Sequence, residues 1–139
     1  MLDRPEVIAI AQRHAASEDS NVLSRVTFVP GDMFDDVPAG DLYVLKTVIH
    51  DWDDVLEKCR DRLPEGGRVV CADKVLPPMG DTSCSGTKLL DMLMMVSLLG
   101  KERTEVEWRS LYERADLAVT SIVTVNPRSG ESIIEGARR

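Results

Sequence analysis

The sequence has 139 residues, of which 43% are hydrophobic and 29% are charged, the balance of a globular chain long enough for one domain. The net charge of −7 argues against nucleic acid as the main partner, because phosphate binding requires a basic face. Cys59, Cys71 and Cys84 show no CxxC spacing, so we expect reduced thiols and neither a disulfide framework nor a metal site.

The sequence gives no sign of export or of a membrane. Its first residues lack the apolar core of a secretion signal. The longest apolar run, residues 89–99, is too short to span a bilayer and is interrupted by Asp91 and Ser97. We therefore expect a cytoplasmic protein that does not enter a membrane.

The first half of the chain alternates helix and strand patterns. Residues 4–16 predict a helix that Pro5 opens, because proline is tolerated in a first turn. "RVTFVP" (25–30) alternates like a strand. "LYVLK" (42–46) is a continuous apolar run, typical of a strand buried on both faces. Apolar residues at helical spacing then predict a helix over 53–63.

The second half continues this alternation. "RVVCADKVL" (68–76) predicts a third buried strand. Residues 85–99 are apolar all round, which indicates a buried helix. Thr104 and Glu107 have the spacing of a capping box, and the helix that they open should end near residue 116.

The chain ends in two strand patterns, "VTSIVTV" and "ESIIEGA", which the turn "NPRSG" (126–130) joins into an antiparallel pair. Alternating strands and helices followed by a hairpin predict an α/β sheet covered by helices.

Polar residues lie within or directly after the three strand segments that should be parallel neighbours. Asp32 and Met33 follow the first strand, His50 and Asp51 follow the second, and Asp73 lies in the third. In open α/β sheets, ligands bind at the carboxyl ends of parallel strands. The pattern therefore predicts one binding edge that carries several acids and a histidine.

Four strings lie in the order of a known family: "LDRPEV", "GDMFDDVPAGDLYVLKTVIHDWDD", "LPEGGRVVCADKVLP" and "LLDMLMMVSLLGKERTEVEWRSL". They resemble the S-adenosylmethionine-dependent O-methyltransferases of the caffeate and acetylserotonin type, including bacterial members of secondary metabolism. The resemblance implies an α/β fold: an incomplete Rossmann-like methyltransferase sheet with flanking helices and a C-terminal antiparallel hairpin. It also implies S-adenosylmethionine as cofactor, a small hydroxylated (phenolic or polyketide-like) acceptor, and a homodimer for a full-length relative.

The resemblance assigns cofactor-binding roles to four residues. Asp3 matches the acid that binds the ribose hydroxyls, and a carboxylate can accept both hydroxyl protons. Asp32 and Met33 match the pair that contacts the adenine, and Lys46 matches a lysine on the cofactor side of the cleft.

The resemblance also assigns the chemistry. His50 matches the general base, a role that histidine suits because its pKa lies near neutrality. Asp73, where the family usually has Glu, and Glu102 match the two acids that flank and orient the histidine. Asp51 and Met94 are implied as contacts of the acceptor.

Several of these residues also have a purely structural explanation. Asp3 is suited to cap the first helix, and Asp32 to start a turn. Glu102 is adjacent to both Lys101 and Arg103 and can form a surface ion pair with either, which would contribute little to stability.

Other family features have no counterpart in the sequence. The Gly-rich strand–turn–helix and the N-terminal dimerisation region are absent, and Gly66–Gly67 precedes a strand, so this pair is a turn. We therefore expect residues 1–139 to be the C-terminal part of a methyltransferase catalytic domain. Two alternatives stay open: a non-catalytic fragment that binds a partner or the cofactor weakly, and a family member redirected to another reaction such as hydroxylation.

Overall fold

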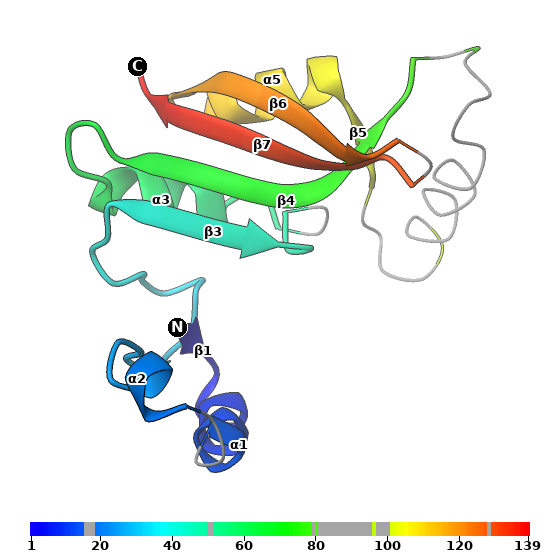
Figure 1. The fold of residues 1–139 in the computed structure, drawn as a ribbon. Helices are drawn as coiled ribbons and strands as arrows, with labels where there is room; N and C mark the ends of the chain where they lie inside the picture. The colour runs from blue at the N-terminus through cyan, green and yellow to red at the C-terminus, as the bar shows by residue number, and fades with distance from the viewer. Residues whose placement is uncertain (16–18, 50–51, 79, 81–95, 97–100, 128) are drawn as a thin grey trace. The chain divides into compact units, whose positions relative to one another are not determined.

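The computed structural model describes residues 1–15, 19–49, 52–78, 80, 96, 101–127 and 129–139. They form two compact units, Met1–Pro38 and Ala39–Arg139, which Figure 1 traces and which are described separately below. Apart from Val96, the helix predicted over residues 85–99 lies outside the described residues.

The first unit contains two helices and a short parallel pair of strands. Strand β1 (Leu2–Asp3) pairs with β2 (Val29–Pro30). Helix α1 (Pro5–Ala15) confirms the predicted helix and its opening proline, and α2 (Ser20–Leu23) follows it. Strand β2 is shorter than the predicted 25–30, because its partner β1 offers only two residues for pairing.

The second unit is built on a mixed sheet with the strand order β3-β4-β7-β6. Strand β3 (Leu42–Lys46) is parallel to β4 (Arg68–Leu76), and β7 (Glu131–Arg138) is antiparallel to both β4 and β6 (Leu117–Asn126). Strand β5 (Arg103–Thr104) pairs in parallel with the last residues of β4. The α/β class and the C-terminal hairpin are thus confirmed.

Helices α3 (Val55–Arg62) and α5 (Glu105–Arg114) lie behind the sheet of this unit in Figure 1. Each buries one face, with Leu56 of α3 and Trp108 of α5 almost fully enclosed. The helix predicted over 53–63 is confirmed, and so is the capping box that opens α5. Among the helices that the structure describes, none combines the length and hydropathy needed to cross a membrane.

Strand β3 corrects one prediction. Its continuous apolar run predicted burial on both faces, but Leu42 is 56% exposed and Val44 is 64% exposed. Alternate side chains of a strand point to opposite faces of the sheet. Tyr43 and Leu45 are half-buried, whereas Leu42 and Val44 point to the other face of the sheet, away from the side on which α3 and α5 lie.

The core between the sheet and the helices contains two thiols. Cys59 of α3 and Cys71 of β4 are free and buried, and burial raises the pKa of each thiol to about 12. The Tyr112 hydroxyl lies 3.1 Å from the Cys71 sulfur and 3.2 Å from the Ile134 carbonyl oxygen. Burial also raises the pKa of Tyr112. These groups are neutral at pH 7 and act as core residues.

The contact between α5 and β7 generates a stability prediction. A Cβ atom at Gly136 would lie 2.4 Å from the ring of Tyr112, so Gly136→Ala forces the helix away from the sheet. We expect a loss of about 1–3 kcal/mol in the free energy of unfolding, as for other overpacked cores. Urea denaturation measures it.

Gly40→Ala is the matched control, because a Cβ atom there meets its nearest neighbour at 3.9 Å. Equal unfolding midpoints for the Gly136 and Gly40 variants would contradict this account of the α5–β7 contact.

Candidate functional site

Two acids of the first unit lie at one edge of its parallel strand pair. Asp3 ends β1 opposite Pro30, and the amide of Gly31 donates to the carbonyl oxygen of Asp3 at 3.0 Å. Asp32 follows directly, so both acids lie at the carboxyl ends of neighbouring strands, and both are exposed. Met33 beside them is half-buried.

The local hydrogen bonds of these acids bear on the structural explanations. Asp32 Oδ1 accepts from the amide of Phe34 at 2.8 Å, so Asp32 does start a turn. Asp3 Oδ1 accepts from the amide of Arg4 at 2.8 Å. Arg4 precedes the helix, whereas an N-cap side chain accepts from an amide two or three residues later, so Asp3 is not an N-cap. A carboxylate has about four acceptor positions, so both acids can accept further hydrogen bonds. They fit the hydroxyl and amino donors of a nucleoside.

The second unit also has acids at the carboxyl end of its parallel strands. Strand β3 ends with Lys46 opposite Ala72, and β5 joins β4 only at Val75. Asp73 lies between these two pairings and is 4% exposed. Lys46, at the end of β3, is exposed.

Glu102 directly precedes β5 and is 5% exposed. The interpretation of this residue as half of a surface ion pair is therefore wrong. Lys101 instead contacts Glu107, with Nζ 3.1 Å from Oε1. Because β5 runs parallel to β4, Glu102 and Asp73 both precede that pairing, and each is a buried carboxyl group. Buried acids are common in functional sites.

The turn after β3 connects this edge to α3. Thr47 has φ of 51°, a left-handed conformation that is uncommon for a β-branched residue, and its amide donates to Ala72 at 3.1 Å. Such strain often marks functional positions. Ile49 is completely buried and Trp52 is 49% exposed.

Three predicted site residues fall outside the part of the chain that the structure describes. They are His50, Asp51 and Met94. Their near neighbours in sequence, Ile49 and Asp53, are both described.

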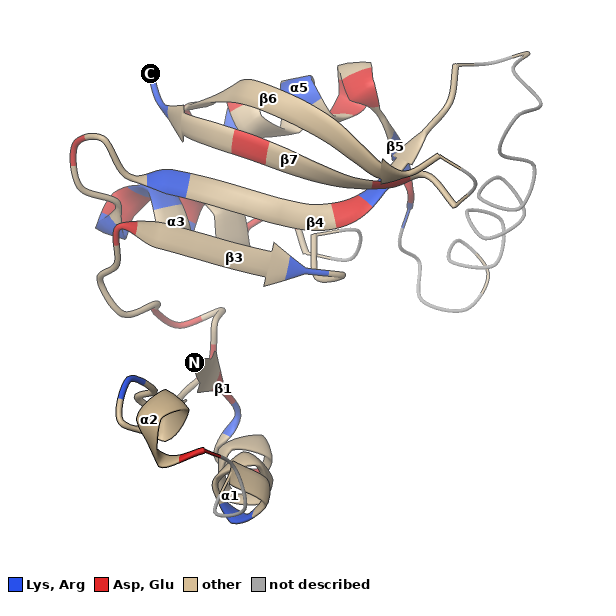
Figure 2. Cartoon of the chain, viewed as in Figure 1, with Lys and Arg blue, Asp and Glu red and all other residues tan. Residues whose placement is uncertain are grey.

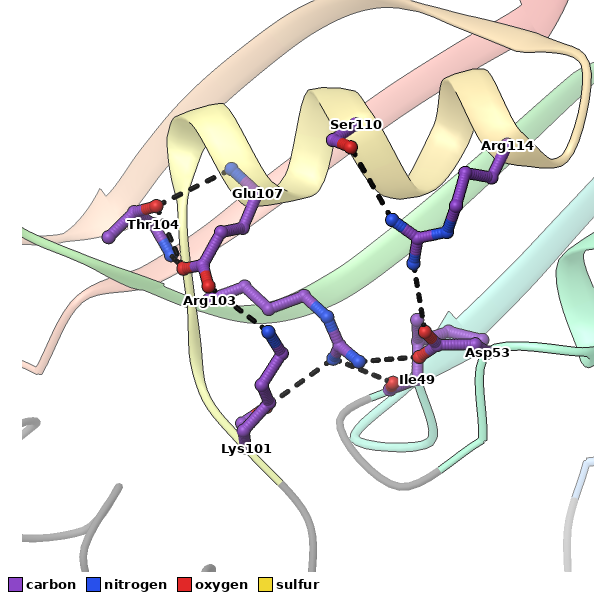
Figure 3. Close-up of polar contacts among 8 residues, drawn as sticks. All are labelled: Ile49, Asp53, Lys101, Arg103, Thr104, Glu107, Ser110 and Arg114. Carbon is purple, nitrogen blue, oxygen red and sulfur yellow. Dashed lines mark hydrogen bonds and ion pairs between the residues drawn. The ribbon is translucent and has the colours of Figure 1, made fainter.

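Arg103 holds both of these neighbours, as Figure 3 shows. Its Nη1 donates to the carbonyl oxygen of Ile49 at 2.9 Å, and its Nη2 donates to Asp53. The other oxygen of Asp53 accepts from Arg114 at 3.1 Å. The sequence offered Arg103 only as a possible partner of Glu102. The available signal was Trp108, one helical turn later, because arginine and tryptophan often stack.

Beside Arg103, Glu107 closes the capping box of α5. Its Oε2 accepts from the amide and the hydroxyl of Thr104, each at 2.9 Å (Figure 3). The backbone hydrogen bond from Thr104 is the main cause that lowers the pKa of Glu107 to about 2, and the nearby Lys101 acts in the same direction. The helix is thus fixed at the residue that follows Arg103.

The second unit carries charged residues of both signs. Figure 2 shows acidic and basic segments interspersed on α3, β4 and α5. Within the described ranges, no group of three or more His, Cys, Asp or Glu side chains is arranged to hold a metal ion.

Comparisons with known proteins agree with one another. Residues 1–118 match the family model described as an O-methyltransferase domain. Acetylserotonin O-methyltransferase of Mus musculus is 37% identical over 123 residues, which is 83% of this chain and 32% of the relative. The chain therefore spans about a third of the length of that curated relative.

Solved structures show the same similarity. CalO1, a methyltransferase in calicheamicin biosynthesis in its SAH-bound form, has a TM-score of 0.83 at 33% identity over 99% of this chain and 40% of its own. NcsB1, an O-methyltransferase from neocarzinostatin biosynthesis in complex with S-adenosylmethionine and 2-hydroxy-5-methyl naphthoic acid, has a TM-score of 0.80 at 31% identity, with the same coverage.

The lowered pKa of Glu107 predicts a pH dependence of stability. A carboxyl group with a depressed pKa stabilises the fold above its unfolded value near 4.5, and this contribution is lost as the pH falls towards 2. We expect Glu107→Gln to lower the unfolding midpoint at pH 6, and the gap to the parent protein to narrow between pH 4.5 and 2. Urea unfolding at a series of pH values measures the gap. A gap of constant size would refute the charged capping box.

Proposed function

The chain belongs to the O-methyltransferase family, and we propose that the protein in which it occurs methylates a hydroxyl group of a small aromatic or polyketide-like molecule. The observation that carries the proposal is the burial of two acids: Asp73, one residue past the end of the β3–β4 pairing, and Glu102, directly before β5. Their sequence neighbours Ala72 and Arg103 are hydrogen-bonded to Thr47 and Ile49, which precede His50 in the sequence.

We propose S-adenosylmethionine as the cofactor, in line with the SAH bound to CalO1 and the S-adenosylmethionine bound to NcsB1. When bound, it supplies an electrophilic methyl group. Asp3 would accept from the ribose hydroxyls, and Asp32 from the adenine amino group, with Met33 against the ring. Lys46, exposed at the end of β3, would lie on the cofactor side of the cleft.

The remaining roles concern the acceptor and its proton. In this proposal His50 takes the proton from the acceptor hydroxyl at one imidazole nitrogen. Asp73 and Glu102 hold the imidazole in the tautomer that leaves this nitrogen free, and they stabilise the imidazolium that forms. Asp51 and Met94 would contact the acceptor. Placing the hydroxyl in line with the methyl group contributes roughly 7–11 kcal/mol in well-oriented systems.

The acceptor class follows from the same relatives. NcsB1 was solved with a hydroxylated naphthoic acid, and the mouse relative is named for acetylserotonin. We therefore propose that hydroxylated naphthoic acids, acetylserotonin and simple catechols form the first panel of acceptors. We also propose a cytoplasmic enzyme that forms a homodimer, of which this chain is one part of the catalytic domain.

His50→Gln tests the base directly. In the full-length protein we expect kcat to fall by about 10²- to 10⁴-fold, because general base catalysis has this typical magnitude. The affinity for S-adenosylhomocysteine should stay within about threefold, since the base does not hold the cofactor. Transfer of a radioactive methyl group to the acceptor panel and calorimetry measure the two quantities.

His14→Gln is the matched control, because the chain contains only two histidines. His14 lies on α1, with its ring Nδ1 3.0 Å from the Ile10 carbonyl oxygen, and its replacement should leave kcat close to that of the parent. A His50→Gln enzyme with parental kcat would exclude His50 as the base.

A further inference from the structure

The guanidinium of Arg103 is an almost fully enclosed charge. Only 5% of its side chain is exposed, against 39% for its partner Asp53. A buried cation is costly unless acceptors surround it. Those acceptors are the carbonyl oxygens of Ile49 and Lys101, at 2.9 and 3.3 Å, and the carboxylate of Asp53.

These acceptors identify what Arg103 restrains. Ile49 and Asp53 lie 54 and 50 residues away in sequence, and they are the two ends of the five-residue stretch 49–53. Nη1 holds the first end and Nη2 the second. The two nitrogens belong to one rigid plane, so the guanidinium fixes the separation of the two ends as well as their position.

The orientation of the guanidinium is itself fixed from the sheet. Its Cζ lies 5.6 Å from the ring centroid of Trp108, a cation–π contact. The indole Nε1 of Trp108 donates to the carbonyl oxygen of Lys74 at 3.0 Å. Lys74 is the residue after Asp73 on β4. Strand β4, which carries Asp73, therefore orients the guanidinium that binds Ile49 and Asp53.

A second arginine completes the arrangement around Asp53. Arg114, in the last turn of α5, contacts Asp53 Oδ2 at 3.1 Å and Ser110 at 3.4 Å, as Figure 3 shows. Its side chain is 59% exposed, so water screens this ion pair much more than the contact made by Arg103. The two arginines thus bind one carboxylate with different strength.

We infer that Arg103 is a positioning residue: it fixes Ile49 and Asp53, between which the proposed base His50 stands in the sequence, relative to β4, the strand that carries Asp73. The inference rests on the proposed function, because it assigns the base to His50. Arg103 does not touch the acceptor or the cofactor in this account. It acts on the rate by holding Ile49 and Asp53.

Arg103→Lys is the central variant, because lysine keeps the positive charge but lacks the planar guanidinium that donates from two nitrogens. In the full-length protein we expect kcat to fall roughly 10- to 100-fold, the range that a misplacement of about 1 Å produces. KM for the acceptor should change much less. Arg109→Lys is the matched control: Arg109 lies on α5 and pairs with Glu105 at 2.8 Å on the exposed face, so kcat should be retained.

Hydrogen exchange supplies a readout that does not depend on activity. Peptides that cover residues 47–56 should exchange faster in Arg103→Lys than in the parent protein, while peptides of β6 and β7 stay unchanged. A merely structural role would speed exchange throughout Ala39–Arg139 and lower kcat only in proportion to the folded fraction.

Asp53→Asn tests the same contact from its more exposed side, should Arg103→Lys fail to fold. It retains an oxygen that can accept from Nη2, so we expect a smaller loss of kcat, with faster exchange again confined to residues 47–56. Parental kcat together with parental exchange in the variants that fold overturns the inference and leaves the methyltransferase proposal intact. A parent protein that methylates no acceptor of the panel overturns both.

Discussion

A guanidinium enclosed beside the end of a strand needs acceptors on several sides, and this requirement organises the second unit. Arg103 meets it with two main-chain carbonyl groups and one carboxylate, drawn from segments about fifty residues apart. Its face rests on Trp108, which is bonded to the end of β4. The turn after β3, the start of α5 and the end of β4 are thereby held at a single group.

That arrangement depends in turn on how closely α5 approaches the sheet. Gly136 of β7 allows the Tyr112 ring to lie against the strand, in a space that any side chain would fill. The same helix begins at Thr104, where the capping box fixes its first turn. Packing at one end of α5 and capping at the other therefore determine where Arg103 enters the site. The role proposed for the acids therefore depends on two contacts away from them: Tyr112 against Gly136, and the capping box of Thr104 and Glu107.

Local patterns in the sequence predicted the elements well. Strands β3 and β4 have the predicted bounds, and the capping box was visible as two residues at fixed spacing. Two predictions were wrong because they depend on neighbouring elements, which local patterns do not specify. Strand β2 is shorter than predicted because β1 is short, and one face of β3 is exposed. The length of β2 and the burial of β3 depend on which strand or helix lies beside each, and a run of apolar residues does not specify this.

The candidate site was predicted in part, for the same reason. The rule that parallel strands place their carboxyl ends together predicted an acid at Asp73, which is buried one residue past the end of the β3–β4 pairing. Glu102 was named from the family resemblance alone. Arg103 was missed because its partners lie far along the chain, and an arginine within "GKERT" looks like any exposed charge. The roles assigned to His50, Asp51 and Met94 stay predictions.

The spacing between Arg103, Thr104 and Glu107 has a consequence for how this segment can vary. Adding or removing one residue at the start of α5 would rotate every later side chain by about 100° around the helix axis. Trp108 would then leave the guanidinium and Tyr112 would leave Gly136. Related enzymes should therefore tolerate substitutions in this segment more readily than insertions or deletions. Chimeric genes should place their crossovers outside residues 101–116.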